Sequence, residues 1–107
     1  MNSVLLLRVG DTLPVFDATI TDEAGTPVDL TGATVTLELT PFDAAGDMVP
    51  LTCSIVGAAT AGRVRYAWQA GDTDTAVHYR GHLRCVFAGG GERLVPTAGF
   101  LTVWIRP

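Results

Sequence analysis

The residues of this chain that could do chemistry are few, and their spacing matches no metal-binding pattern. Asp72 and Asp74 lie two apart in a polar stretch, but a calcium loop would need more oxygen ligands. We therefore expect a solvated turn that caps the following strand. His78 and His82 lie four apart on a predicted strand, too far along it to chelate one ion easily, so we expect two surface histidines.

The potential nucleophiles are equally isolated. Ser3 and Ser54 are the only serines, and neither lies in a Gly-x-Ser-x-Gly sequence. Cys53 and Cys85 form no Cys-x-x-Cys pair and have no histidines at metal-ligand spacing, so we expect two buried thiols. No helix is predicted after the glycine run 89–91, which indicates a hairpin tip rather than a phosphate loop. We therefore predict that the chain is not an enzyme and has no catalytic residue, metal ion or cofactor.

Four arginines form the candidate binding surface. Arg63 and Arg65 share one face of a predicted strand, and Arg80 and Arg84 share one face of the next long strand. If the two strands are neighbours, one sheet face carries four guanidinium groups, which could bind an acidic protein or an anionic polymer. The alternative is an ordinary polar outer face, whose arginines pair locally with Glu38 or with aspartates.

Charge is distributed unevenly along the chain. The formal net charge of -4 argues against nucleic-acid binding as the main role. Residues 1–62 contain one arginine and eight acidic residues, whereas residues 63–107 contain six arginines and three acidic residues. A GC-rich genome would also favour arginine over lysine. The asymmetry predicts a heterologous contact in which acidic loops, such as Asp22-Glu23 or Asp43-Asp47, meet the arginine face of a neighbouring molecule.

Period-two alternation recurs along the sequence, and helical periodicity does not. Strands are predicted at 3–9, 13–21, 33–40, 48–56, 63–69, 77–87, 93–95 and 100–105. Nearly half the residues are apolar, which is enough for one domain of this length to bury a core. The pattern predicts an all-β, immunoglobulin-like sandwich of about seven to nine mainly antiparallel strands, with residues 1–107 as a single domain.

The alternation also predicts the core between the two sheets. Its expected members are Val35, Leu37, Leu39, Val64, Tyr66, Trp68, Leu83, Cys85 and Phe87. In the last strand, Phe100 and Trp104 alternate with Leu101, Val103 and Ile105, so at least one of these sets is expected to be exposed.

The segment from Asp74 to Tyr79 resembles the antibody stretch Asp-Thr-Ala-Val-Tyr-Tyr. In antibody domains that stretch forms a tyrosine corner, in which a tyrosine at the start of a late strand ties down the preceding loop. The resemblance implies this role for Tyr79. Gly81 stands where the antibody disulfide cysteine would be, so neither that disulfide nor membership of the antibody family is implied.

A broader resemblance covers nearly the whole chain. Its motifs, in order, are Gly10-Asp11-Thr12-Leu13-Pro14, Asp29-Leu30-Thr31-Gly32-Ala33-Thr34-Val35, Gly62-Arg63-Val64-Arg65-Tyr66-Ala67-Trp68, Gly71-Asp72-Thr73-Asp74 and Tyr79-Arg80-Gly81. Together they resemble the N-terminal domain of the phage baseplate upper protein family. That family implies an immunoglobulin-like domain that anchors a receptor-binding apparatus in a tail baseplate. Larger members continue beyond this domain, whereas this chain stops at Pro107.

The resemblance implies a non-catalytic structural protein of a bacteriophage tail or baseplate, which binds other virion proteins, in multiple copies. One alternative is a capsid decoration or a head–tail neck protein. An alternative of another class is a carbohydrate- or cell-surface-binding module with a host glycan as its ligand. With no signal peptide and no apolar stretch long enough to span a bilayer, we expect no membrane partner and a virion assembled in the host cytoplasm.

Overall fold

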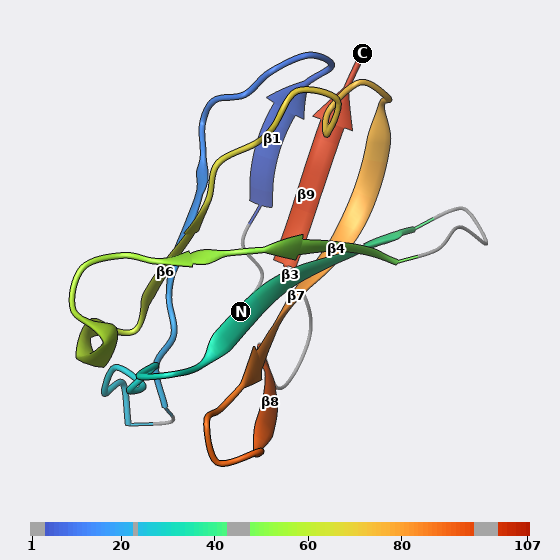
Figure 1. Cartoon of the computed structure of the whole chain (residues 1–107). Helices are drawn as coiled ribbons and strands as arrows, with labels where there is room; N and C mark the ends of the chain where they lie inside the picture. Colours follow the sequence, from blue (N-terminus) through green and yellow to red (C-terminus); the bar gives the residue numbers. More distant parts are fainter. Residues whose placement is uncertain (1–3, 23, 43–47, 96–100) are drawn as a thin grey trace.

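The computed structural model describes residues 4–22, 24–42, 48–95 and 101–107, which form two stacked β-sheets (Figure 1). The strands are β1 (Val4–Arg8), β2 (Phe16–Thr19), β3 (Thr34–Pro41), β4 (Val49–Thr52), β5 (Ser54–Ile55), β6 (Arg63–Tyr66), β7 (Val77–Val86), β8 (Glu92–Val95) and β9 (Leu101–Arg106), with one 3₁₀ turn, η1 (Ala59–Ala61). No helix in the described part of the chain has the length and apolarity needed to cross a membrane.

The strand order is that of an immunoglobulin-like sandwich. The large sheet has the order β1-β9-β7-β3-β4, with β8 also paired to β7, and the small sheet has the order β2-β6-β5. These correspond to the two sheets of the immunoglobulin fold, in which the second, fifth and fourth strands face the third, sixth and seventh. The described strands pair antiparallel except β1, which runs parallel to β9. The predicted fold class is therefore confirmed.

The segment predicted as one strand at 48–56 instead divides between the sheets. Residues 49–52 pair with β3 in the large sheet, and residues 54–55 pair with β6 in the small sheet. Cys53 lies at the crossing, where it is buried and its N–H donates to the Val35 carbonyl at 2.9 Å. The alternation pattern does not reveal such a crossing, because the side chains that face the core continue to face it when the strand changes sheets.

The turn before β6 depends on a glycine. Gly62 follows η1 with φ of 67°, in the left-handed region that side chains disfavour. A Cβ atom there would lie 2.6 Å from the Ile20 carbonyl oxygen and 3.2 Å from the Val28 backbone. The Ile20 N–H donates to the Gly62 carbonyl at 2.8 Å, so this contact joins the turn to the segment after β2.

The core lies between the sheets and follows the predicted alternation. Of the predicted members, all are buried except Phe87, which is partly buried against the others. Trp68 remains buried although β6 ends at Tyr66, and its Nε1–H donates to the Pro14 carbonyl at 3.0 Å. The Tyr66 and Trp68 rings meet edge to face at 5.2 Å. In β9, Val103 and Ile105 are buried, Trp104 is exposed, and Phe100 lies outside the described residues.

Candidate functional site

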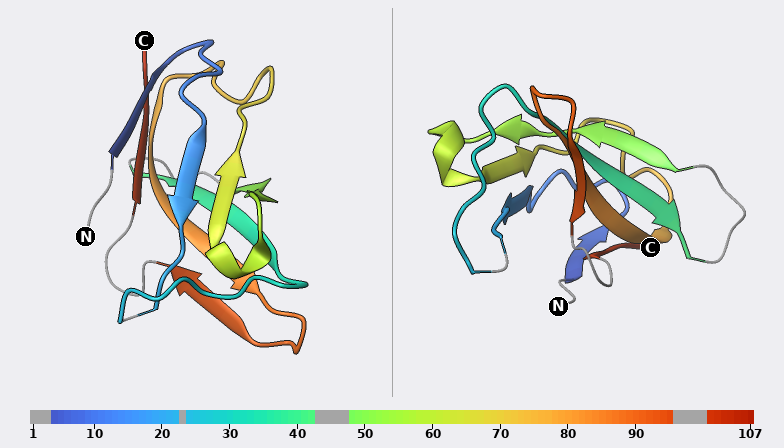
Figure 2. Two further views of the ribbon diagram at one scale, coloured as in Figure 1. Left: turned by 90° about the vertical axis from the view of Figure 1, so that its left-hand side faces the viewer. Right: turned by 90° about the horizontal axis from the view of Figure 1, so that it is seen from below.

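The four candidate arginines do not share one face. Arg63 and Arg65 belong to β6 in the small sheet, and Arg80 and Arg84 belong to β7 in the large sheet. In the left view of Figure 2, the small sheet lies in front of the large one. β6 and β7 are therefore not neighbours, and the predicted face with four arginines is wrong. Consecutive strands of a sandwich often cross between sheets, and here the connection at residues 67–76 makes that crossing.

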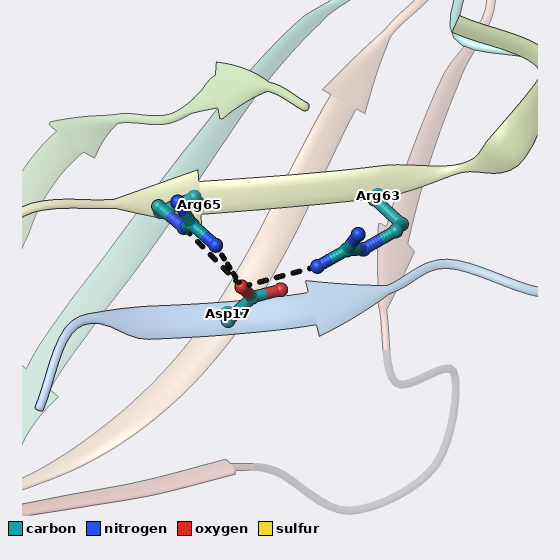
Figure 3. A network of polar contacts seen from close by, with 3 residues as sticks. All are labelled: Asp17, Arg63 and Arg65. Atoms are coloured by element: carbon teal, nitrogen blue, oxygen red, sulfur yellow. Dashed lines mark hydrogen bonds and ion pairs between the residues drawn. The ribbon is translucent and has the colours of Figure 1, made fainter. Parts of the chain in front are cut away.

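Arg63 and Arg65 pair with an acidic residue of the adjacent strand (Figure 3). Asp17 lies opposite Arg65 in the β2–β6 register. Its Oδ2 accepts from Arg65 Nη2 at 2.8 Å and Nε at 3.2 Å, and from Arg63 Nη2 at 3.4 Å. Hydrogen bonding to Arg65 and the charges of both guanidinium groups lower the pKa of Asp17. This is the local pairing that the alternative interpretation predicts.

Arg84 is paired in the same way on the outer face of the large sheet. Its Nε donates to Glu38 Oε2 at 2.9 Å, and its Nη1 donates to Glu92 Oε1 at 3.4 Å. The hydrogen bond and charge of Glu38 raise the pKa of Arg84. Three of the four candidate arginines thus have a carboxylate partner within the domain, and the fourth, Arg80, lies in a different environment.

That environment is a row of rings at the β1–β9–β7 end of the same outer face. His78 of β7 stacks on Trp104 of β9 with ring centroids 4.8 Å apart, and it meets Phe42 at 4.5 Å. The Arg80 guanidinium lies 5.6 Å from the Phe42 ring centroid, and that of Arg106 lies 5.2 Å from the Trp104 centroid. We call these five residues the aromatic–arginine strip.

Apolar side chains of β1 continue the strip to the edge of the sheet. Leu6 lies opposite Trp104 in the parallel β1–β9 register, and it is 52% exposed, compared with 39% for Trp104. Val4, opposite Thr102, is also exposed. Exposed apolar and aromatic side chains gathered beside arginines are typical of protein interfaces. Sequence reasoning named Arg80 and Trp104 separately, but their proximity depends on the β7–β9 pairing, which alternation alone does not predict.

The two histidines differ in their surroundings. His78 belongs to the strip, whereas His82 lies opposite Glu38 in the β3–β7 register. Both are partly buried rather than fully exposed. Over the described ranges, no group of three or more histidine, cysteine or acidic side chains is placed to hold a metal ion.

The loop after β6 is structural and only partly solvated, which corrects the expectation for Asp72 and its neighbours. Asp72 accepts a hydrogen bond from the Tyr66 hydroxyl and another from the Gln69 N–H at 2.8 Å. Thr73 is buried, and its Oγ1 donates to the Asp11 carbonyl at 2.8 Å, while Asp74 is exposed. Burial and the Asp72 carboxylate raise the pKa of Tyr66. The loop is therefore fixed to the β6 strand and to the segment after β1.

The expected tyrosine corner at Tyr79 is not formed within the described residues. The Tyr79 hydroxyl has no hydrogen-bond partner there, and Tyr66 instead ties down the loop. The Tyr79 side chain lines a cavity of about 270 Å³, together with Leu39, Val49, Leu51, Trp68, Gly71, Asp72 and Thr75. Asp72, the acidic group of this lining, already holds Tyr66, so its role here is structural.

The two cysteines lie in the core as free thiols, as predicted. Burial raises the pKa of Cys53 to about 11, and it also raises the pKa of Cys85. A thiol with such a pKa is protonated at neutral pH, and the thiolate is the nucleophilic form. This environment therefore favours a packing role for both residues.

Comparisons with models of protein families, with curated proteins and with solved structures gave no match for this chain.

Proposed function

We propose that this chain is a non-catalytic docking module of a bacteriophage virion, in the tail or baseplate, which binds other virion proteins. The observation that carries the docking role is the aromatic–arginine strip with its apolar extension on β1. Tryptophan and arginine are the residues that most often dominate the binding energy of protein interfaces. A sheet face with such residues exposed is suited to contact another protein surface.

The virion assignment rests on the resemblance of the ordered motifs. In this fold those motifs carry structural residues, among them Gly62 at its tight turn, Trp68 in the core and Asp72 under Tyr66. The motifs therefore support a domain architecture shared with the phage baseplate upper protein family. The strip supports docking onto another protein as the mode of action. A capsid decoration or a neck protein would use the same surface at a different place in the particle.

A glycan-binding module is the alternative from another class, and the exposure of Trp104 favours it. Sugars bind by stacking on an exposed aromatic face. Here the His78 ring and the Arg106 guanidinium already lie over Trp104. Part of the Trp104 ring is therefore already covered, so the arrangement favours a protein partner that contacts ring edges and guanidinium groups.

The composition of purified particles tests the proposed function. Phage particles banded by density from cells that carry the gene should contain this chain at a constant copy number per particle, and gold-labelled antibody should bind at one position. Labelling of the tail tip supports the tail or baseplate, and labelling of the head or neck supports the alternative positions. Particles that lack the chain would contradict the proposal, and binding of the isolated chain to host glycans would then support the alternative class.

A further inference from the structure

We propose that the aromatic–arginine strip binds the acidic loop between β2 and β3 of a second copy of this chain, in a head-to-tail contact. The inference rests on the proposed docking function and names its partner. It assigns Arg80 and Arg106 to the basic side of the contact, and Asp22 and Asp29 to the acidic side.

Within the described residues, the basic side has no ion-paired acidic partner. Strands β1 and β9 and residues 77–81 of β7 contain no aspartate or glutamate. Among the described residues, no carboxylate forms an ion pair with Arg80 or Arg106, in contrast to Arg84 at the other end of the same face. Their guanidinium groups lie over aromatic rings, a position that leaves the N–H donors available to a carboxylate.

The acidic side has the opposite imbalance. Residues 9–62 contain no arginine or lysine, so no basic residue lies in or near this loop in the sequence. Asp22 Oδ1 accepts from the N–H groups of Ala24 and Thr26, and Asp29 Oδ1 accepts from the N–H and hydroxyl of Thr31. In both residues Oδ2 has no hydrogen-bond partner within the described ranges, and both residues are exposed.

These local hydrogen bonds fix the two carboxylates before any partner arrives. The hydrogen bonds from Thr31 lower the pKa of Asp29, so this carboxylate is ionised at neutral pH. Side chains that are already ordered lose less conformational entropy on binding. The loop therefore presents fixed negative charge that is available to the guanidinium groups of another molecule.

The two surfaces lie too far apart to meet within one molecule. The chain between β2 and β3 lies at the lower end in Figure 1 and in the left view of Figure 2, and β9 ends at the upper end. The molecule is 39 Å in its longest dimension. Complementary surfaces at opposite ends produce a heterologous contact, which repeats from copy to copy and builds a ring or a filament. A second copy of this chain therefore carries the acidic loop that complements the basic strip of the first.

Sedimentation velocity of the full chain tests the contact. We expect association that increases with protein concentration at low salt and weakens at high salt, because exposed charges are screened. The double variant Arg80→Glu with Arg106→Glu, and separately Asp22→Lys with Asp29→Lys, should each lower the association constant by about tenfold or more. An equimolar mixture of the two double variants should associate again, since each then presents the complement of the other.

The control is Arg63→Glu with Arg65→Glu, which makes the same change of charge on the small sheet and should associate like the unmodified chain. Circular dichroism melts check that every variant folds; Arg80→Gln with Arg106→Gln replaces the arginine variant if it does not fold, and Asp22→Asn with Asp29→Asn replaces the aspartate variant. An unmodified chain that stays monomeric at every concentration at low salt overturns the inference, as does a mixture that fails to associate. Monomeric chain that is nevertheless present in particles would leave the proposed function standing and remove the self-contact alone.

Discussion

At the scale of single residues, two tryptophans with the same side chain have opposite roles. Trp68 is 4% exposed in the core, with its Nε1–H bonded to the Pro14 carbonyl, whereas Trp104 is exposed in the strip. Alternation in the sequence places Trp68 inward. Alternation does not predict whether Trp104 points into the core or outward. Because Val103 and Ile105 are buried, Trp104 lies on the outer face.

We expect Trp68→Ala to lower the free energy of unfolding by about 3–5 kcal/mol, because it leaves a large cavity and an unpaired carbonyl. Trp104→Ala is the matched control and should cost less than about 1 kcal/mol, as an exposed residue outside the core. Urea unfolding followed by circular dichroism measures both. Equal losses for the two variants would contradict the assignment of Trp68 to the core.

At the scale of elements, the fold depends on where the chain crosses between sheets. The inward face of each strand could be predicted, because period-two alternation records it directly: Val35, Leu37 and Leu39 are buried as expected. The pairing of strands could not be predicted from the sequence, because it is set by contacts between distant segments. The crossing at Cys53 and the separation of Arg63 from Arg80 therefore do not follow from the alternation pattern.

The turn at Gly62 gives a prediction at this scale. Gly62→Ala should destabilise the domain by about 2 kcal/mol or more, because alanine disfavours positive φ and its Cβ would meet the Ile20 carbonyl oxygen. Gly57 has a similar φ of 68° but nothing within 4 Å of its Cβ position, so Gly57→Ala should cost only about 1 kcal/mol. Urea midpoints for the two variants separate the close contact from the backbone conformation. Indistinguishable midpoints would show that the close contact at Gly62 contributes nothing.

At the scale of the whole molecule, the two outer faces differ in how their charges are paired. On the small sheet, Asp17 pairs with both Arg63 and Arg65. On the large sheet, Arg84 is ion-paired at one end, whereas at the other end neither arginine of the strip forms an ion pair with a described carboxylate. We therefore propose the strip end of the large sheet as the docking surface and expect the outer face of the small sheet to tolerate substitution.

The central claim, that this end of the large sheet is the docking surface, is tested most directly by a pair of leucines. Leu6 beside the strip and Leu94 at the far end both face outward on the same sheet, 52% and 36% exposed. Leu6→Asp and Leu94→Asp make the same change at the two ends, and the copy number of each variant in purified particles can be counted by quantitative mass spectrometry. We predict that Leu6→Asp is lost from the particles while Leu94→Asp is incorporated normally, provided that both melt like the unmodified chain. Normal incorporation of Leu6→Asp, or loss of Leu94→Asp instead, would contradict the claim.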